Sequence, residues 1–188
     1  MKNRILVGLL IGVVAMTIPS RWSASAITEE YQARLLSGGM QLTEQVKKIR
    51  ISIDSYTTSE EVYNLMKIQY EQGFEPFMNA FRALNKGIFF PIGARGIKII
   101  IHGAHSIPTE KGRQILLFAQ RQPWDVDMSQ RIDSRFPFMV IELNVDDKGK
   151  GNGKIYDQAS ISLTAERTFS MSGYNAPPVQ LWDVKLLK

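Results

Sequence analysis

The chain contains no cysteine and only two histidines among its 188 residues. Without cysteine it can form no disulfide, no thiol nucleophile and no zinc–thiolate site. The Gly-x-Ser-x-Gly sequence that positions the nucleophile of many serine hydrolases is also absent. The fold must therefore be stabilised by the packing of apolar residues, and a chain of this length can bury enough of them.

A long hydrophobic run is also missing, apart from a short apolar segment near the amino terminus, Ile5 to Ile18. Lys2 and Arg4 precede this segment, and an Ala-Ser-Ala triplet ending at Ala26 follows it. This order is typical of a secretory signal peptide, and the run is shorter than the roughly 20 residues of a membrane-spanning helix. We expect cleavage after Ala26 and a single exported domain, 27–188, that is periplasmic or secreted.

Charge is nearly balanced in the expected mature chain. The full sequence has 23 Lys plus Arg against 18 Asp plus Glu, and three of the basic residues precede the expected cleavage point. Attraction to nucleic acid or to an anionic membrane needs a concentrated basic patch, which a small net charge does not indicate. The composition therefore predicts neither as a partner, and we expect an unknown small molecule or protein instead.

Periodicity and turn residues predict an α+β fold. Residues 48–56 alternate between apolar and polar, as in a half-buried strand. Thr58 to Glu61 has the residues of a helix amino-terminal cap. Gly73 is expected to separate two helices, and Asn85 to Gly87 to end the second helix with the usual cap in the left-handed conformation. Further strands are expected at 31–36, 97–102, 113–121, 138–145, 154–164, 168–172 and 179–186. These elements predict a curled or barrel-like antiparallel sheet of about seven or eight strands, with a two-helix excursion over 59–87 packed on it.

An apolar stripe recurs at helical spacing in the second expected helix; its members are Phe74, Phe77, Met78, Phe81 and Leu84. Such a stripe could line a cofactor pocket. A helix that lays its apolar face on a sheet needs the same pattern, however, and we favour that interpretation. No cofactor is expected.

The glycine-rich stretch from Leu143 to Asp157, LNVDDKGKGNGKIYD, could hold a phosphate, hold a calcium ion or form a turn. A phosphate-binding loop is excluded because its spacing is one residue short and Ile155 replaces the required hydroxyl. A calcium loop is excluded because Lys148 stands where an oxygen ligand is needed. We therefore predict a hairpin between two alternating strands.

The segments IRISIDSYTTSEEVYNL, RFPFMVIELNVDDKGKGNGKI and GYNAPPVQL resemble a family of small exported bacterial proteins of unassigned function. The resemblance covers Tyr31 to Lys188. Members carry a Thr-Asp-Arg-Pro tetrad at the end of the central strand, whereas this chain reads AQRQP from Ala119 to Pro123, so that Arg121 could match the arginine and the acidic member is missing. The resemblance implies fold boundaries and no reaction, cofactor or partner.

Candidate chemical groups are few. His102 and His105 lie three apart at an expected strand end, which should point them to opposite faces, so no metal site is expected. Carboxylates on or beside strands, Glu142, Asp157 and Glu166, are compatible with a hydrolase. Asp157 is in phase with apolar residues of the inner face and could be a buried general acid, unless it lies at a sheet rim or a β-bulge resets the phase.

The long connection 122–137 is a second candidate, because ordered loops of that length usually have a purpose. It combines an aromatic residue with charges of both signs, which suits recognition of a carboxylate, a sugar or a protein surface. Its candidate binding residues are Trp124, Asp125, Asp127, Arg131 and Arg135; Asp133 lies among them. A solvated loop whose tryptophan covers the core edge is the alternative. Two hypotheses remain, a noncatalytic exported binding or scaffold domain and a carboxylate-dependent hydrolase.

The leader gives the first testable prediction. Expressed in a bacterium with an intact export pathway, the protein should be recovered with Ile27 as its first residue, because Ala-Ser-Ala suits signal peptidase. Amino-terminal sequencing or intact mass measurement checks this. A mature protein that still began at Met1 would contradict it.

Overall fold

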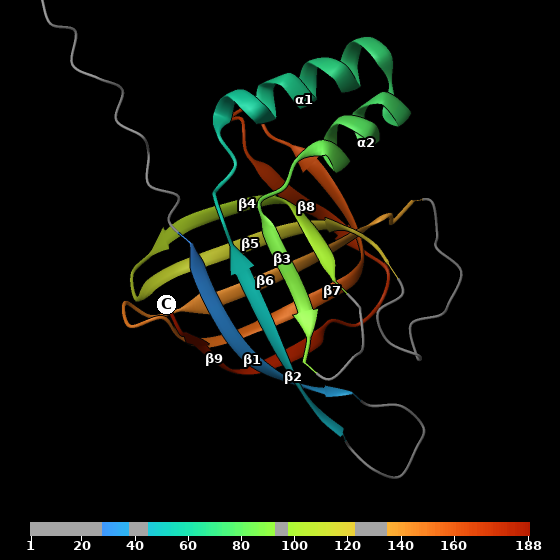
Figure 1. The fold of residues 1–188 in the computed structure, drawn as a ribbon. Helices are drawn as coiled ribbons and strands as arrows, with labels where there is room; N and C mark the ends of the chain where they lie inside the picture. The colour runs from blue at the N-terminus through green and yellow to red at the C-terminus, as the bar shows by residue number, and fades with distance from the viewer. Residues whose placement is uncertain (1–27, 38–44, 93–97, 123–134) are drawn as a thin grey trace, which may run out of the picture.

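A computed structural model of the protein describes residues 28–37, 45–92, 98–122 and 135–188 (Figure 1). Its elements follow in chain order: β1 (Glu29–Ser37), β2 (Gln45–Ile53), α1 (Ser59–Gln72), α2 (Phe74–Ala83), β3 (Gly87–Pro91), β4 (Ile99–Thr109), β5 (Gly112–Gln120), β6 (Phe138–Val145), β7 (Lys150–Leu163), β8 (Phe169–Tyr174) and β9 (Val179–Leu186). The described chain is therefore α+β, with both helices between β2 and β3.

The sheet closes into an antiparallel barrel of eight strands. Neighbours pair in the order β6-β5-β4-β3-β2-β1-β9-β7, and β6 also pairs with β7, which joins the two ends of that series. The remaining strand, β8, pairs with the part of β7 that extends past the barrel. This confirms the predicted α+β fold with a barrel-like antiparallel sheet and a two-helix excursion.

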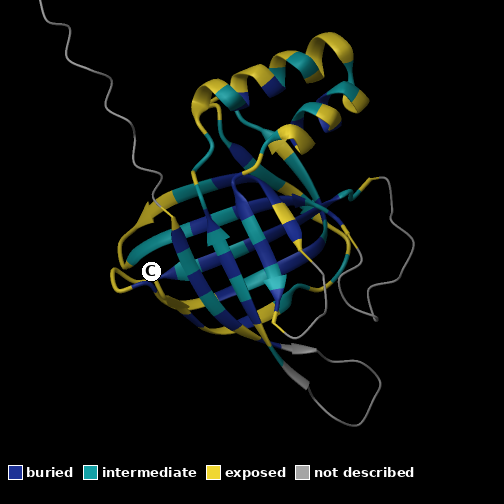
Figure 2. Ribbon diagram, in the orientation of Figure 1, coloured by how far each residue is buried: buried dark blue, intermediate teal, exposed yellow. Residues whose placement is uncertain are grey.

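The barrel interior is filled with side chains. Alternate residues of every barrel strand point inward, and buried and more exposed positions alternate along the strands in Figure 2. The interior cluster consists of Tyr31, Ala33, Leu35, Ile49, Ile51, Ile53, Phe89, Ile99, Ile101, Ala104, Ile115, Leu117, Ala119, Met139, Ile141, Leu143, Val145, Ile155, Leu181 and Val184. An eight-stranded barrel is just wide enough for such side chains to fill it. Most of its stability thus comes from apolar burial around the barrel axis.

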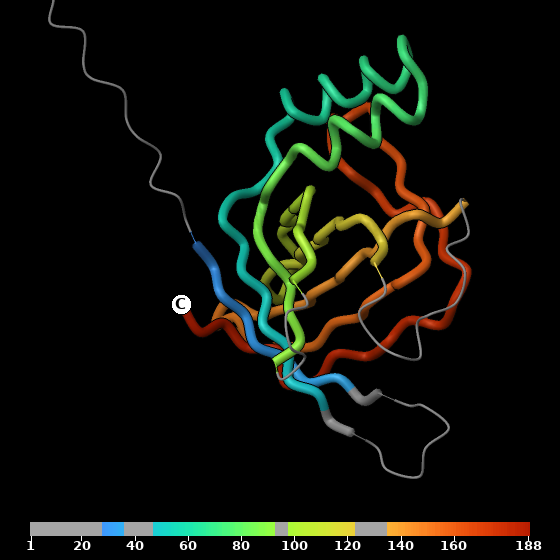
Figure 3. Tube along the Cα trace, turned by 45° about the vertical axis from the view of Figure 1, so that its right-hand side comes forward, coloured from blue at the N-terminus to red at the C-terminus, as the bar shows by residue number. Residues whose placement is uncertain are grey.

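The two helices lie beyond one end of the barrel (Figures 1 and 3), and there they cover a second apolar cluster. Phe77, Met78 and Phe81 of α2 are buried there against Phe138 and Phe169 of the sheet. The aromatic stripe therefore packs on strands, as predicted. Phe74 alone among its aromatic members stays 45% exposed.

The start of α1 is capped as predicted. The Thr58 hydroxyl accepts a hydrogen bond from the Glu61 amide at 3.2 Å, and the Glu61 carboxylate accepts one from the Thr58 amide at 2.8 Å. The same carboxylate also pairs with the buried Lys86 ammonium at 2.6 Å. Because Lys86 precedes β3, this pair ties the first turn of the helix to the barrel.

Three features differ from the sequence-based expectations. β3 was not predicted, because GIFFP is short and ends in proline. β4 continues to Thr109 rather than ending at His102, since one extra residue at His102 forms a bulge and the pairing resumes beyond it. The second helix ends at Ala83 and its cap residue, Leu84, is extended, so Asn85 to Gly87 does not form a left-handed cap.

The predicted hairpin is confirmed, with one correction in its second arm. β6 and β7 pair from Val145 opposite Gly151 onward, and the turn holds Gly149 at a φ of 72°. β7 then gains one residue relative to β6 between Tyr156 and Ala159. The arm was expected to have one continuous apolar face, but the bulge places Ile155 in the barrel interior and Ala159 in the helix-side cluster.

Neither α1 nor α2 is long and apolar enough to cross a membrane, and the described residues contain no other helix.

Gly87 provides a test of the fold. Its φ is 149°, and an added Cβ would collide with the backbone of Ser52 and Ile53 on the paired strand. We expect Gly87→Ala to lower the free energy of unfolding by about 3 kcal/mol or more, because the backbone itself must move. Urea denaturation measures this change.

Gly73 is the matched control, since its φ of 93° is also unfavourable for alanine but nothing lies within 4 Å of an added Cβ. Gly73→Ala should cost about 1 to 3 kcal/mol, from backbone strain alone. Equal losses in the two variants would show that the Gly87 contact does not constrain the β2–β3 pair.

Candidate functional site

Basic side chains gather on the outer surface of four neighbouring strands, β2, β1, β9 and β7. Because the inward positions of these strands are apolar, the polar positions between them face outward. We call this surface the basic face; its cations are Arg34, Lys48, Arg50, Lys150, Lys154 and Lys185. Arg34, Lys48, Lys150 and Lys185 are exposed, and the other two are partly exposed.

Strand register arranges these cations in rows. Arg50 lies opposite Gln32, Gln32 opposite Lys185, and Lys185 opposite Lys150, so one row crosses four strands. With strands about 4.8 Å apart, the row is about 14 Å wide. Lys48 and Arg34 face each other in the next row. The cations therefore cover an area rather than a single point.

Two acidic residues on these strands pair with the arginines. Glu30 lies 2.7 Å from Arg50, and Asp183 lies 3.3 Å from Arg34. The four lysines form no ion pair within the described part of the chain. Six cations against two carboxylates give this surface more positive charge than the expected mature chain has in total.

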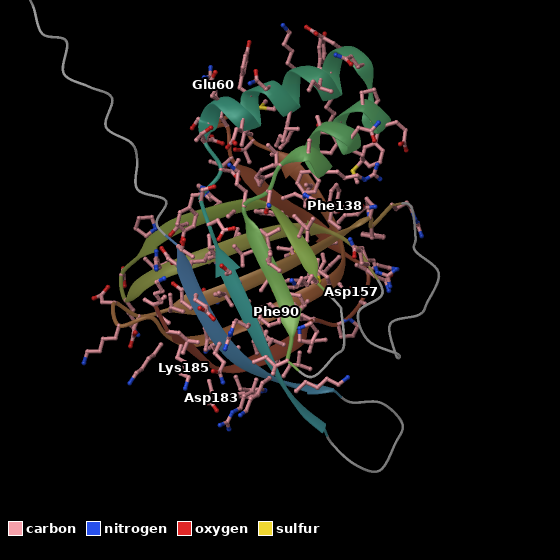
Figure 4. All side chains as sticks on the ribbon, in the orientation of Figure 1. Glu60, Phe90, Phe138, Asp157, Asp183 and Lys185 are labelled. Atoms are coloured by element: carbon pink, nitrogen blue, oxygen red, sulfur yellow. The ribbon has the colours of Figure 1, made fainter. Side chains whose placement is uncertain are left out.

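A groove of about 390 Å³ lies within the basic face. Gln32, Arg34, Lys150, Gly151, Asp183, Val184 and Lys185 line it. β9 carries one extra residue relative to both β1 and β7 at this point, and Asp183 has a φ of 51°. This bulge turns both Trp182 and Asp183 outward, and Trp182 is 54% exposed. Figure 4 shows Asp183 and Lys185 near one another at the side of the barrel formed by β9.

The groove is lined mainly by groups that can bind an anion. Lysine ammonium groups and the Arg34 guanidinium donate hydrogen bonds to carboxylate, phosphate or sulfate oxygens. The lining also contains the Asp183 carboxylate, which lies 3.3 Å from the Arg34 guanidinium. Its chemistry is therefore that of recognition of an anion.

Asp157 and Arg121 form a separate, buried ion pair. Arg121 Nε lies 2.9 Å from Asp157 Oδ2, and the two side chains are 3% and 9% exposed. Asp157 Oδ1 is buried without a hydrogen-bond partner in the described structure. The Asp157 side chain lies at the β7 bulge, which is the predicted alternative to an inner-face position. Because its carboxylate neutralises Arg121, Asp157 is placed to hold the end of β5 rather than to transfer a proton to a substrate.

A second polar network lies at the barrel end where β1 and β5 begin. Arg113 binds both carboxylate oxygens of Glu29, at 3.0 and 2.7 Å, and also donates to the hydroxyls of Tyr31 and Tyr56. Burial, together with the neighbouring Glu29 carboxylate, raises the pKa of Tyr56 to about 12 and raises that of Tyr31 further. Both phenols therefore stay protonated at neutral pH and donate to Glu29.

The other carboxylates proposed for hydrolysis lie in different surroundings. Glu142 is on the outer surface of β6, where it accepts hydrogen bonds from Tyr156, Asn144 and Gln114. Glu166 is exposed in the turn between β7 and β8. The hydrogen bonds of the described residues do not link either of them to Asp157, so they do not form one linked site.

His102 is structural on the evidence of its contacts. His102 Nδ1 donates to the Leu84 carbonyl at 2.8 Å, and its ring lies 5.1 Å from that of Phe81. Burial lowers the pKa of His102, which keeps the ring neutral at neutral pH. His105 lies opposite Leu116 on the outer side of β4. Simple alternation predicted that the two rings would lie on opposite faces; that prediction is wrong, because the bulge at His102 shifts the alternation by one residue. In the described ranges, no group of three or more His, Asp or Glu side chains could hold a metal ion.

The predicted recognition loop lies largely outside the described residues. Trp124, Asp125, Asp127, Arg131 and Asp133 fall there, so that interpretation stays a prediction. Arg135 is described; it is exposed, and its guanidinium lies 5.8 Å from the Phe136 ring.

Sequence reasoning missed the basic face. The alternation of 48, 50 and 52 against 49, 51 and 53 did identify Lys48 and Arg50 as outward residues, which was a usable signal. Lys150, Lys154 and Lys185 come from strands at least 100 residues beyond Arg50, and only the pairing order brings them together. The net charge near +2 of the expected mature chain gave no sign that positive charge is concentrated on one surface.

No protein-family model, no curated protein and no solved structure matches the chain, and the resemblance to small exported proteins stays a prediction.

The Arg121–Asp157 pair gives a stability prediction. Asp157→Ala should lower the free energy of unfolding by about 3 kcal/mol or more, because it removes the carboxylate that lies 2.9 Å from the buried Arg121 guanidinium. The double variant Arg121→Ala/Asp157→Ala should lose less than the sum of the two single losses. Denaturant titration of the four proteins completes the cycle.

The exposed Arg34–Asp183 pair is the comparison. Arg34→Ala should change the free energy of unfolding by less than about 1 kcal/mol, because solvent screens that pair. Additive losses at Arg121 and Asp157 would mean that their contact contributes nothing to the fold.

Proposed function

We propose that the protein is a noncatalytic, exported binding domain whose binding surface is the basic face. The observation that carries this proposal is the groove between β1, β9 and β7, where Arg34, Lys150 and Lys185 converge. The ligand is anionic, because a carboxylate, phosphate or sulfate group there gains hydrogen bonds and charge neutralisation together.

The filled barrel interior supports an external site. Barrels that carry ligands inside leave room along their axis, whereas here apolar side chains from all eight barrel strands meet in the interior. The outer surface is where charge is left unpaired. The four lysines of the basic face have no ion-pair partner among the described residues, so their charge is available to a ligand.

Export is part of the proposal and rests on the leader. A stable, cysteine-free barrel suits a compartment outside the cytoplasm as well as one inside it, so the fold adds no argument on location. The expected cleavage after Ala26 supports a mature protein that meets its ligand in the periplasm or outside the cell.

The proposal predicts a charge-specific binding defect. With inorganic tripolyphosphate as the probe, NMR amide shifts of the wild type should cluster on β1, β7 and β9. Lys150→Gln/Lys185→Gln should weaken binding by roughly tenfold, since it removes two of the three cations in the groove.

The matched control is Lys67→Gln/Lys98→Gln, which removes the same charge from exposed positions on α1 and ahead of β4. It should bind like the wild type. If both variants lost affinity equally, net charge rather than the basic face would be responsible, and the proposal would be wrong.

A further inference from the structure

We infer that the ligand of the basic face is an acidic polysaccharide, a chain of sugars with carboxylate groups repeating along it. This inference rests on the proposed function and names the class of its ligand. It draws on the spread of the cations, the exposed Trp182 and the carboxylate of Asp183.

The spread of the cations indicates a ligand with several charges. The row from Arg50 to Lys150 is about 14 Å wide, from three strand spacings. Lys154 extends the surface further along β7. A single anionic group makes hydrogen bonds of about 3 Å and reaches two or three neighbouring cations. An extended chain with repeated anionic groups can contact them all.

Trp182 indicates that the ligand has apolar ring faces as well as charge. Its side chain is 54% exposed, and its position opposite Arg34 sets it in the second row of cations. An indole offers a flat apolar surface at the edge of water. The C–H face of a sugar ring can stack on this surface while its hydroxyls and carboxylate point to the polar groups on either side.

Asp183 fits a sugar better than a purely anionic chain. Its carboxylate stands among the cations that line the groove, where it repels a bound anion. A carboxylate can only accept hydrogen bonds, and sugar hydroxyls donate them. Gln32 adds an amide that both donates and accepts. The groove of about 390 Å³ can thus hold one sugar unit with its acidic group toward Lys150 and Lys185.

Single-stranded nucleic acid fits less well. Proteins that bind it stack successive bases on several aromatic side chains. The described part of the basic face offers Trp182, whereas the neighbouring Phe90 on β3 is covered by Arg50, whose guanidinium lies 5.7 Å from that ring. Without a series of free aromatic rings, nucleic acid would contribute its charge alone.

The test measures binding of the mature protein to polygalacturonate by calorimetry, at low and at moderate salt. Dextran serves as the neutral polymer, galacturonic acid as the single charged unit and oligothymidylate as the nucleic acid. We expect polygalacturonate to bind at least roughly tenfold more tightly than each of the others, and to weaken as salt rises.

Two other outcomes would each contradict one part of this inference. Equal or tighter binding of oligothymidylate would replace the polysaccharide by nucleic acid, and equal binding of galacturonic acid would reduce the ligand to a small anion. Both results would leave the proposed function standing. If neither these probes nor tripolyphosphate bound, the proposed function itself would be wrong.

Variants at Trp182 separate stacking from charge. Trp182→Ala should weaken polygalacturonate binding by roughly tenfold and leave tripolyphosphate binding unchanged, and Trp182→Phe should restore most of the loss. Tyr70→Ala, at a 93% exposed aromatic residue on α1, is the control and should change neither. Equal effects of Trp182→Ala on both probes would remove the argument for a sugar. Thermal unfolding confirms that each variant is folded.

Discussion

The pairing of β6 with β7 is the constraint on which the rest of the structure depends. It joins the two ends of an eight-strand series, so every barrel strand gains two neighbours. Closure then fixes which side of each strand is inside, because alternate residues face opposite sides. The apolar interior and the basic face are two results of this single condition.

Much of the fold could be predicted because local patterns were consistent with it. β6 carries no extra residue relative to its partners and alternates between buried and partly buried residues from Ile141 to Val145, and the hairpin at Gly149 follows from turn chemistry. β3 was not predicted, because a strand of five residues is too short to show a recognisable alternation. The bulge at His102 was not predicted, because an extra residue is accommodated by the partner strand, which the local sequence does not reveal. A bulge near Asp157 was one of the alternatives considered from the sequence, and the structure has it.

The candidate site was harder to predict for a related reason. The alternation in β2 predicts that Lys48 and Arg50 face outward. Lys150 and Lys185 become their neighbours only through the β1–β9 and β9–β7 pairs. The β9 bulge that turns Trp182 and Asp183 outward also depends on those pairs. A surface assembled from distant strands cannot be read from any one of them. The carboxylates that sequence did single out proved to be engaged separately, with Arg121 and with Tyr156.

The contact between the first and last strands has a consequence for biosynthesis. β1 pairs with β9, and the Glu30 amide donates to the carbonyl of Lys188. The barrel cannot close while residues 179–188 are still inside the ribosome, so β1 and β7 keep open edges until that segment has emerged. Open strand edges can pair with other chains, so such a chain needs protection from aggregation during that interval.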